Sequence, residues 1–170
     1  QINLKKIRQT ITHSALSLKI ICQWSGALCA VKGKIMIIRK ATRSDAEFII
    51  KSQIDMAMES EGMVLKPEII TPGVQAVFDD PNESKGHYLI AMDEEQHLGC
   101  LLVTTEWSDW RNGTILWIQS LFVIPEARGK KVFKRMYEYM QAMVHDKNSD
   151  FCGIRLYVEK ENQRAIDVYE

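Results

Sequence analysis

The chain has 170 residues, of which 46% are hydrophobic and 26% charged, as is typical of a single globular domain with a substantial core. Its 22 Lys and Arg residues balance 22 Asp and Glu residues, but residues 1–35 hold six of the basic residues and none of the acidic ones. Residues 36–170 therefore carry 16 basic against 22 acidic residues. This acidic balance argues against nucleic-acid binding through bulk charge, so a bound anion would have to be held by local geometry.

Residues 1–35 differ in character from the rest of the chain. They are basic, they contain an apolar run at 14–31, and the first methionine is Met36, where a strand-like sequence begins. Two interpretations are open: a targeting peptide, or an accessory or spurious extension. We favour the extension, because Lys19 and Gln23 interrupt the apolar run. The run is also too short and too polar to span a bilayer, and we expect no membrane contact.

From Met36 onward, hydrophobic periodicity and turn residues predict alternating strands and helices. In chain order they are a strand at 36–41, helices at 44–61 and 67–78, strands at 87–92, 98–107 and 114–123, a helix ending near His145, a strand at 152–158 and a helix from Asn162. Pro72-Gly73 is expected to interrupt the second helix, and Asn112-Gly113 predicts a hairpin before the strand at 114–123.

The four cysteines show no C-x-x-C spacing and no histidines at zinc-ligand intervals, so we expect no metal site. Cys100 and Cys152 lie in apolar, strand-like runs, where buried free thiols are the more common state. Reduced thiols favour a cytoplasmic location.

Residues 119–137 combine an apolar strand, a basic loop and an amphipathic helix. The strand ends in Val-Ile-Pro, and the loop Arg128-Gly129-Lys130-Lys131 leads directly into the helix. Backbone N–H groups and three cations at a helix N-terminus favour binding of a polyanion such as a pyrophosphate. The alternative is a solvated basic helix start.

The order V-x-P-x-x-R-G-x-x-V at residues 123–132 resembles the coenzyme-binding motif of the GNAT superfamily, the acyl-CoA-dependent N-acyltransferases. Arg128 and Gly129 match the family's R-G-x-G-x-G, whereas Lys131 and Phe133 occupy the positions of the later glycines. Residues 154–170 are similar to the family's fifth strand followed by N-x-x-A-x-x-x-Y. The resemblance therefore covers residues 36–170.

The resemblance implies an α/β (α+β) fold: a mixed, mostly antiparallel sheet with flanking helices. It also implies that the strands at 114–123 and 152–158 run parallel but splay apart, which opens a cleft for the pantetheine arm. The chain stops at Glu170, within the last expected helix, so the family's last two strands are missing and the domain is expected to be incomplete. The strand at 152–158 would then have an unpaired edge, unless a second chain covers it in a homodimer.

The implied co-substrate is acetyl-CoA, without a metal. Main-chain groups of the strand would pair with pantetheine, the basic loop would cradle the pyrophosphate, and Asn162 would bond the coenzyme as well as cap the last helix. The predicted coenzyme-binding residues are Leu121, Phe122, Val123, Arg128, Gly129, Lys130, Lys131, Val132, Phe133 and Asn162. Lys131 departs from the family because a Cβ there hinders close approach of a phosphate, although its ammonium can pair with one.

Two residues are candidates for proton transfer. Tyr169 lies seven residues after Asn162, where the family has its general acid; otherwise it is a helix tyrosine packed on the core. Some relatives carry a glutamate that acts as the general base at the position of Tyr157. This chain lacks that glutamate, so Glu106, beside Trp107, is our candidate general base. The alternative for Glu106 is a hairpin-edge carboxylate in solvent.

Further side chains are candidates for the acceptor site. Glu59 and Glu61 could attract a cationic substrate, and three tryptophans could either wall its pocket or belong to the core. These tryptophans are Trp107, Trp110 and Trp117. The resulting hypothesis is transfer of an acetyl group from acetyl-CoA to a primary amine of a small molecule or a protein, by direct attack. The alternative is a CoA-binding or non-catalytic remnant of such an enzyme, which Lys131 favours.

Overall fold

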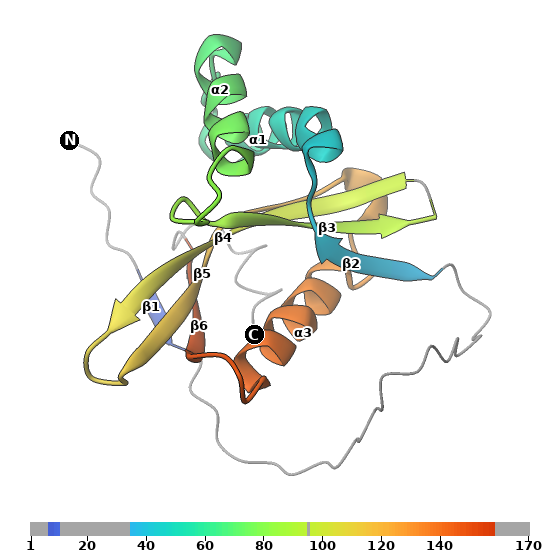
Figure 1. The fold of residues 1–170 in the computed structure, drawn as a ribbon. Helices are drawn as coiled ribbons and strands as arrows, with labels where there is room; N and C mark the ends of the chain where they lie inside the picture. The colour runs from blue at the N-terminus through green and yellow to red at the C-terminus, as the bar shows by residue number, and fades with distance from the viewer. Residues whose placement is uncertain (1–6, 11–34, 95, 159–170) are drawn as a thin grey trace.

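The computed structural model describes residues 7–10, 35–94 and 96–158 (Figure 1). The strands are β1 (Ile7–Thr10), β2 (Met36–Lys40), β3 (His87–Asp93), β4 (Gln96–Ser108), β5 (Gly113–Val123) and β6 (Phe151–Val158). The helices are α1 (Ala46–Glu61), α2 (Pro67–Phe78) and α3 (Val132–His145), with short 3-10 helices η1 (Arg43–Asp45) and η2 (Pro125–Ala127). From β2 to β6 the elements follow the predicted order.

The described strands form one sheet in the order β1-β6-β5-β4-β3-β2. Only β5 and β6 are parallel, and every other neighbouring pair is antiparallel. Helices α1 and α2 lie on one face of the sheet and α3 lies on the other (Figure 1). The predicted fold class, a mixed and mostly antiparallel sheet with flanking helices, is therefore confirmed.

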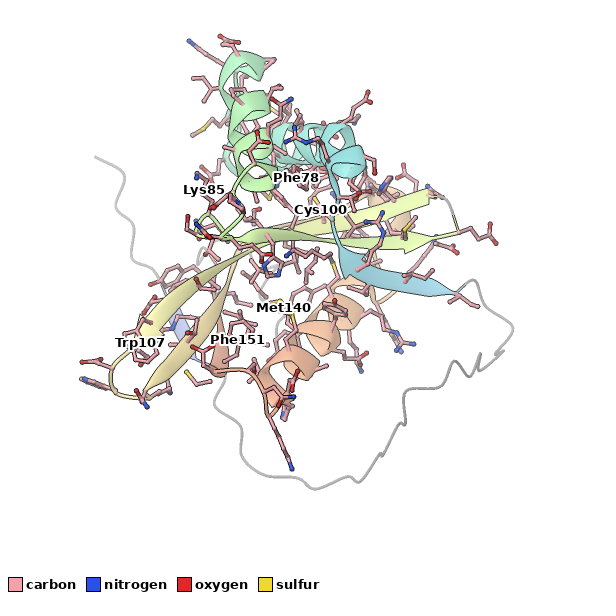
Figure 2. All side chains as sticks on the ribbon, in the orientation of Figure 1. Phe78, Lys85, Cys100, Trp107, Met140 and Phe151 are labelled. Atoms are coloured by element: carbon pink, nitrogen blue, oxygen red, sulfur yellow. The ribbon has the colours of Figure 1, made fainter. Side chains whose placement is uncertain are left out.

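Helix α3 packs on the sheet through the apolar face that its periodicity predicts. Val132, Met136 and Met140 are buried against residues such as Leu101 and Leu116 of the strands. In Figure 2, Met140 lies between the helix and the sheet. Each such buried side chain stabilises the fold by roughly 1.5–3 kcal/mol relative to an exposed one.

The opposite face of the sheet has its own core beneath α1 and α2. Ile49 and Val74 of the helices pack with Ile90, Cys100 and Phe122 of the strands. Cys100 is fully buried and free, as predicted, and burial raises the pKa of its thiol to about 12. The sheet is thus covered on both faces at its β3–β4 end.

A buried carboxylate anchors the start of α1. Asp45 accepts two hydrogen bonds of 2.8 Å from Arg39 and one of 2.7 Å from the backbone N–H of Thr42, and it lies 2.8 Å from His97 Nε2. The Arg39 guanidinium holds the pKa of Asp45 well below its usual range. This network ties the beginning of the helix to β2 and β4.

Helix α2 runs through Pro72 without a break, so the expected interruption there is wrong. Pro72 is exposed and removes a single N–H from the helix, whereas Val74, two residues later, is only 1% exposed. Burial of the apolar face holds the helix together despite the lost hydrogen bond.

None of the helices in the described ranges is long and apolar enough to cross a membrane.

The edge of β6 is paired, although the sequence leads us to expect it to be open. Strand β1 lies antiparallel to β6, with Ile7 opposite Val158 and Thr10 opposite Arg155. The sequence predicts no strand in residues 1–35, because a four-residue segment has no periodicity long enough to recognise. Backbone hydrogen bonding to β6, rather than a local pattern, defines this strand.

Candidate active site

A gap opens in the sheet where β5 separates from β6. Their parallel pairing ends at Ile118 and Leu156, whereas β5 continues to Val123. The register between β4 and β5 shifts at the same point, because Leu102 pairs with Ser120 and Val103 pairs with Ile118. Gln119 is thus the extra residue of a β-bulge, which bends the strand away from its neighbour.

The main-chain groups of Leu121 and Val123 face this gap. The N–H of Ile124 donates to the carbonyl of Leu98 on β4 with a distance of 3.0 Å. Hydrogen-bonded and non-bonded pairs alternate along an antiparallel ladder, so the main-chain groups of Phe122 also bond to β4. The main-chain groups of its neighbours Leu121 and Val123 therefore point away from β4, toward the gap. The gap is therefore lined by peptide groups of β5, in the arrangement that an added extended chain requires.

The basic loop follows η2 at the carboxyl end of β5. Gly129 has a φ of 77°, and a Cβ added to it would meet nothing within 4 Å. Helix α3 begins at Val132, so the N–H groups of its first turn have no acceptor within the helix. Lys130 and Lys131 are both exposed beside them. Amides, a helix N-terminus and two ammonium groups therefore converge on one end of the gap.

Lys131 has a left-handed backbone, with φ 63° and ψ 25°, at a position where the family has glycine. This conformation costs a residue with a side chain about 1–2 kcal/mol. The loop thus keeps the backbone shape that glycine favours although glycine is absent. Phe133 is half-buried against the α3-side core, and its ring lies 6.0 Å from that of Tyr137.

The side chain of Arg128 reaches back toward β5 and α1. Its Nε donates to the carbonyl of Val123 at 2.9 Å, and its terminal nitrogen donates to Glu59 at 2.6 Å. The guanidinium also lies 5.8 Å from the ring centroid of Phe122. Arg128 therefore connects three elements, and Glu59 is engaged by it in an ion pair.

Glu106 lies in a polar cluster on the sheet face opposite α3. Its carboxylate accepts hydrogen bonds from Trp117 Nε1 at 2.6 Å and from Arg155 at 2.8 Å. Arg155 is only 8% exposed, and its guanidinium lies 5.4 Å from the Trp117 ring centroid. The Glu106 side chain itself remains 43% exposed. Both oxygens are thus held in place while part of the carboxylate stays open to solvent.

The three tryptophans separate in the structure. Trp117 is buried in the Glu106 cluster and packs 4.5 Å from the ring of Tyr157. Trp107 and Trp110 are 59% and 95% exposed, and Figure 2 shows Trp107 on the projecting β4–β5 hairpin. The structure brings only Trp117 to the cluster that holds Glu106.

A polar pair beside the bulge is not among the residues predicted from the sequence. Gln53 of α1 is only 7% exposed, and its side-chain amide donates to the Ser120 hydroxyl at 3.2 Å. A signal was present in the sequence, because the adjacent polar residues Gln119 and Ser120 interrupt the alternation in an otherwise apolar strand. The predicted residues Asn162 and Tyr169 lie outside the described residues. In the described part of the chain, no group of His, Cys, Asp and Glu is placed to hold a metal ion.

The sequence model of the acetyltransferase (GNAT) family matches residues 56–170, which is more than half of the chain. The chain belongs to the GNAT family of acetyltransferases. The crystal structure of a possible acetyltransferase from Clostridium difficile 630 is 39% identical, with a TM-score of 0.71, and the match covers 80% of this chain and 88% of that one. No match was found among curated proteins.

More distant structures share the fold of this GNAT chain. The aminoglycoside N-acetyltransferase AAC(6')-Iy in complex with CoA is 14% identical, with a TM-score of 0.63, over 82% of this chain and 88% of that one. An aminoglycoside acetyltransferase from an uncultured soil metagenomic sample, in complex with sisomicin, is 14% identical with a TM-score of 0.61, over 79% and 84%. At this identity the likeness concerns the fold alone.

Proposed function

We propose that this GNAT chain transfers an acetyl group from acetyl-CoA to a primary amine by direct attack, without a covalent enzyme intermediate. One observation carries the proposal: the gap beside β5 and the amide-rich start of α3 meet at the carboxyl end of the same strand. A thioester with a diphosphate tether needs both features, one for the tether and one for the charge.

The residues at the gap fit the coenzyme. Main-chain groups of Leu121 and Val123 would pair with the pantetheine amides in the way that an added strand pairs with a sheet edge. An N–H directed into the gap would stabilise the negative charge that develops on the thioester oxygen. The loop from Gly129 to Lys131 and the first turn of α3 would bind the diphosphate.

Direct attack requires an uncharged amine and a proton for the leaving group. The amine nitrogen forms a bond to the thioester carbonyl carbon, the carbon–sulfur bond breaks, and CoA leaves as a thiolate, while the nitrogen releases its second proton to solvent as the amide forms. We assign removal of the ammonium proton to Glu106, through water, because its carboxylate is fixed yet partly open. Delivery of a proton to the thiolate remains the predicted role of Tyr169, and Asn162 keeps its predicted bond to the coenzyme.

The acceptor is a cationic amine of a small molecule or of a protein. The acidic balance of residues 36–170 supports a substrate that is positively charged in solution. Both of the more distant structures described above are aminoglycoside acetyltransferases, which supports amines of that kind as first candidates. The cytoplasmic location and the homodimer stay predictions.

Two measurements test the proposal in sequence. Acetyl-CoA and CoA should each raise the thermal unfolding midpoint, because a ligand that binds only the folded state must stabilise it. Release of free thiol from acetyl-CoA should then accelerate when sisomicin, spermidine, lysine or a lysine peptide is added. Absence of any thermal shift with either ligand would exclude a competent coenzyme site.

The second candidate function is a CoA-binding protein without catalysis. It is favoured by Lys131, which places a side chain and a strained backbone where the family has glycine. This candidate predicts stabilisation by CoA together with no amine-dependent thiol release across the same panel. The two functions are therefore separated by the second measurement alone.

A further inference from the structure

The Arg128 side chain makes three contacts that leave little of it for a ligand. Its Nε is occupied by the Val123 carbonyl, a terminal nitrogen is occupied by Glu59, and one face lies over the Phe122 ring. The side chain is 25% exposed. A guanidinium held at two edges and one face is a structural link between its neighbours.

Each contact fixes a different part of the proposed coenzyme site. The Val123 carbonyl belongs to a residue whose peptide groups face the gap, so Arg128 caps the end of the lined segment. Glu59 lies in the last turns of α1, 69 residues away in the chain. Arg128 itself precedes Gly129, where the backbone turns left-handed to direct the loop toward α3.

We propose that Arg128 and Glu59 are positioning residues for coenzyme binding, and that Arg128 acts through the loop rather than by touching the diphosphate. Glu59 orients the guanidinium, and the guanidinium holds the start of the loop against the end of β5. The loop amides then point at the diphosphate without reorganising when it binds. This inference rests on the proposed binding of acetyl-CoA.

The substitution Glu59→Gln distinguishes this role from direct binding by the sign of its effect. If Arg128 were a diphosphate ligand, Glu59 would compete with the coenzyme, and its removal would leave affinity unchanged or strengthen it. Loss of one negative charge near a polyanion acts in the same direction. If Arg128 positions the loop, the same substitution weakens binding, because the guanidinium loses the partner that orients it.

The chain offers a matched control for the change in charge. Glu61 is the last residue of α1, it is exposed, and it forms no ion pair with any residue that the structure describes. Glu61→Gln removes the same charge from the same helix end without touching Arg128. Arg128→Lys provides the partner experiment, because it keeps the charge but loses the fork that spans Val123 and Glu59.

The experiment is calorimetric titration of CoA into wild type, Glu59→Gln, Glu61→Gln, Arg128→Lys and the Glu59→Gln/Arg128→Lys double variant. We expect about tenfold weaker binding for Glu59→Gln and for Arg128→Lys, and less than about twofold change for Glu61→Gln. The double variant should bind about as weakly as Arg128→Lys alone, because both changes break one unit. Unchanged thermal midpoints without ligand would show that the variants are folded.

The outcomes separate this inference from the proposed function. If wild type binds CoA and Glu59→Gln binds it equally well or more tightly, the positioning role is refuted and the function stands. Equal weakening by Glu59→Gln and Glu61→Gln would also refute it, because only one of them contacts Arg128. If wild type does not bind CoA, both the function and this inference fail.

Discussion

Replacing Lys131 by glycine should stabilise this acetyltransferase. Lys131 has a φ of 63°, and its exposed side chain forms no ion pair with a described residue. Glycine removes a backbone penalty of about 1–2 kcal/mol, but it adds about 0.4–1 kcal/mol of conformational entropy to the unfolded chain. The expected net gain is therefore about 0.5–1 kcal/mol in the free energy of unfolding. In a chain of this size that corresponds to roughly 2 °C in the thermal midpoint.

Equilibrium unfolding in urea measures this change, and two variants control it. Lys131→Ala should give no gain, because alanine carries the same penalty in the left-handed region. Lys130→Gly should destabilise the fold, because Lys130 does not have a positive φ and glycine there brings only entropy. If Lys131→Gly is no more stable than Lys131→Ala, the backbone at this position is not strained and the reasoning is refuted.

Three further predictions concern the core and its ion pairs. Asp45→Asn should lower the free energy of unfolding by about 2 kcal/mol, since Arg39 loses a buried partner but is itself partly exposed. Because the pKa of Asp45 is lowered by folding, its ion pair stabilises the fold at pH values above the pKa of the unfolded chain, near 4, and this stabilisation is lost as the pH falls. Urea unfolding between pH 7 and pH 3 should therefore show that wild type loses more stability than Asp45→Asn. Parallel losses in the two proteins would contradict this. Cys100, buried and with its pKa raised to about 12, should be alkylated by iodoacetamide only after unfolding, and peptide mapping that finds rapid labelling of the folded protein would contradict it. Met140→Ala should cost about 2–5 kcal/mol in urea unfolding, whereas Met58→Ala, on the exposed part of α1, should cost less than about 0.5 kcal/mol, and equal costs would argue against the packing described.

Local patterns predicted most of the elements in the described ranges. Helix α3 ends at His145 as expected, because Val132, Met136 and Met140 repeat at helical spacing and face one sheet. The hairpin of β4 and β5 also follows its Asn112-Gly113 signal, whereas the parallel pairing of β5 with β6 follows what the family resemblance implies. In these segments propensity, turn residues and burial all favour the same structure.

The contacts of the basic loop could not be predicted in the same way. A sequence that contains Arg128 shows a cation near a helix start, and both a phosphate and a carboxylate are suitable partners for it. The choice depends on Glu59, which only the packing of α1 beside β5 brings within reach. The link between Glu106 and Arg155 is similar, because they lie 49 residues apart on strands that are not neighbours. Such pairings are set by the tertiary fold.

The bulge at Gln119 accounts both for the gap beside β5 and for the direction of the peptide groups that line it. Before the bulge, Leu116 and Ile118 face α3, and after it Leu121 and Val123 do so, an interval of three residues in a strand whose period is two. Strict alternation would have turned the side chains of Leu121 and Val123 away from the α3 core. The extra residue keeps them on that core, and it is exposed itself. Because the same residue ends the pairing with β6, burial of the apolar side chains after the bulge enforces an open edge of peptide groups beside them.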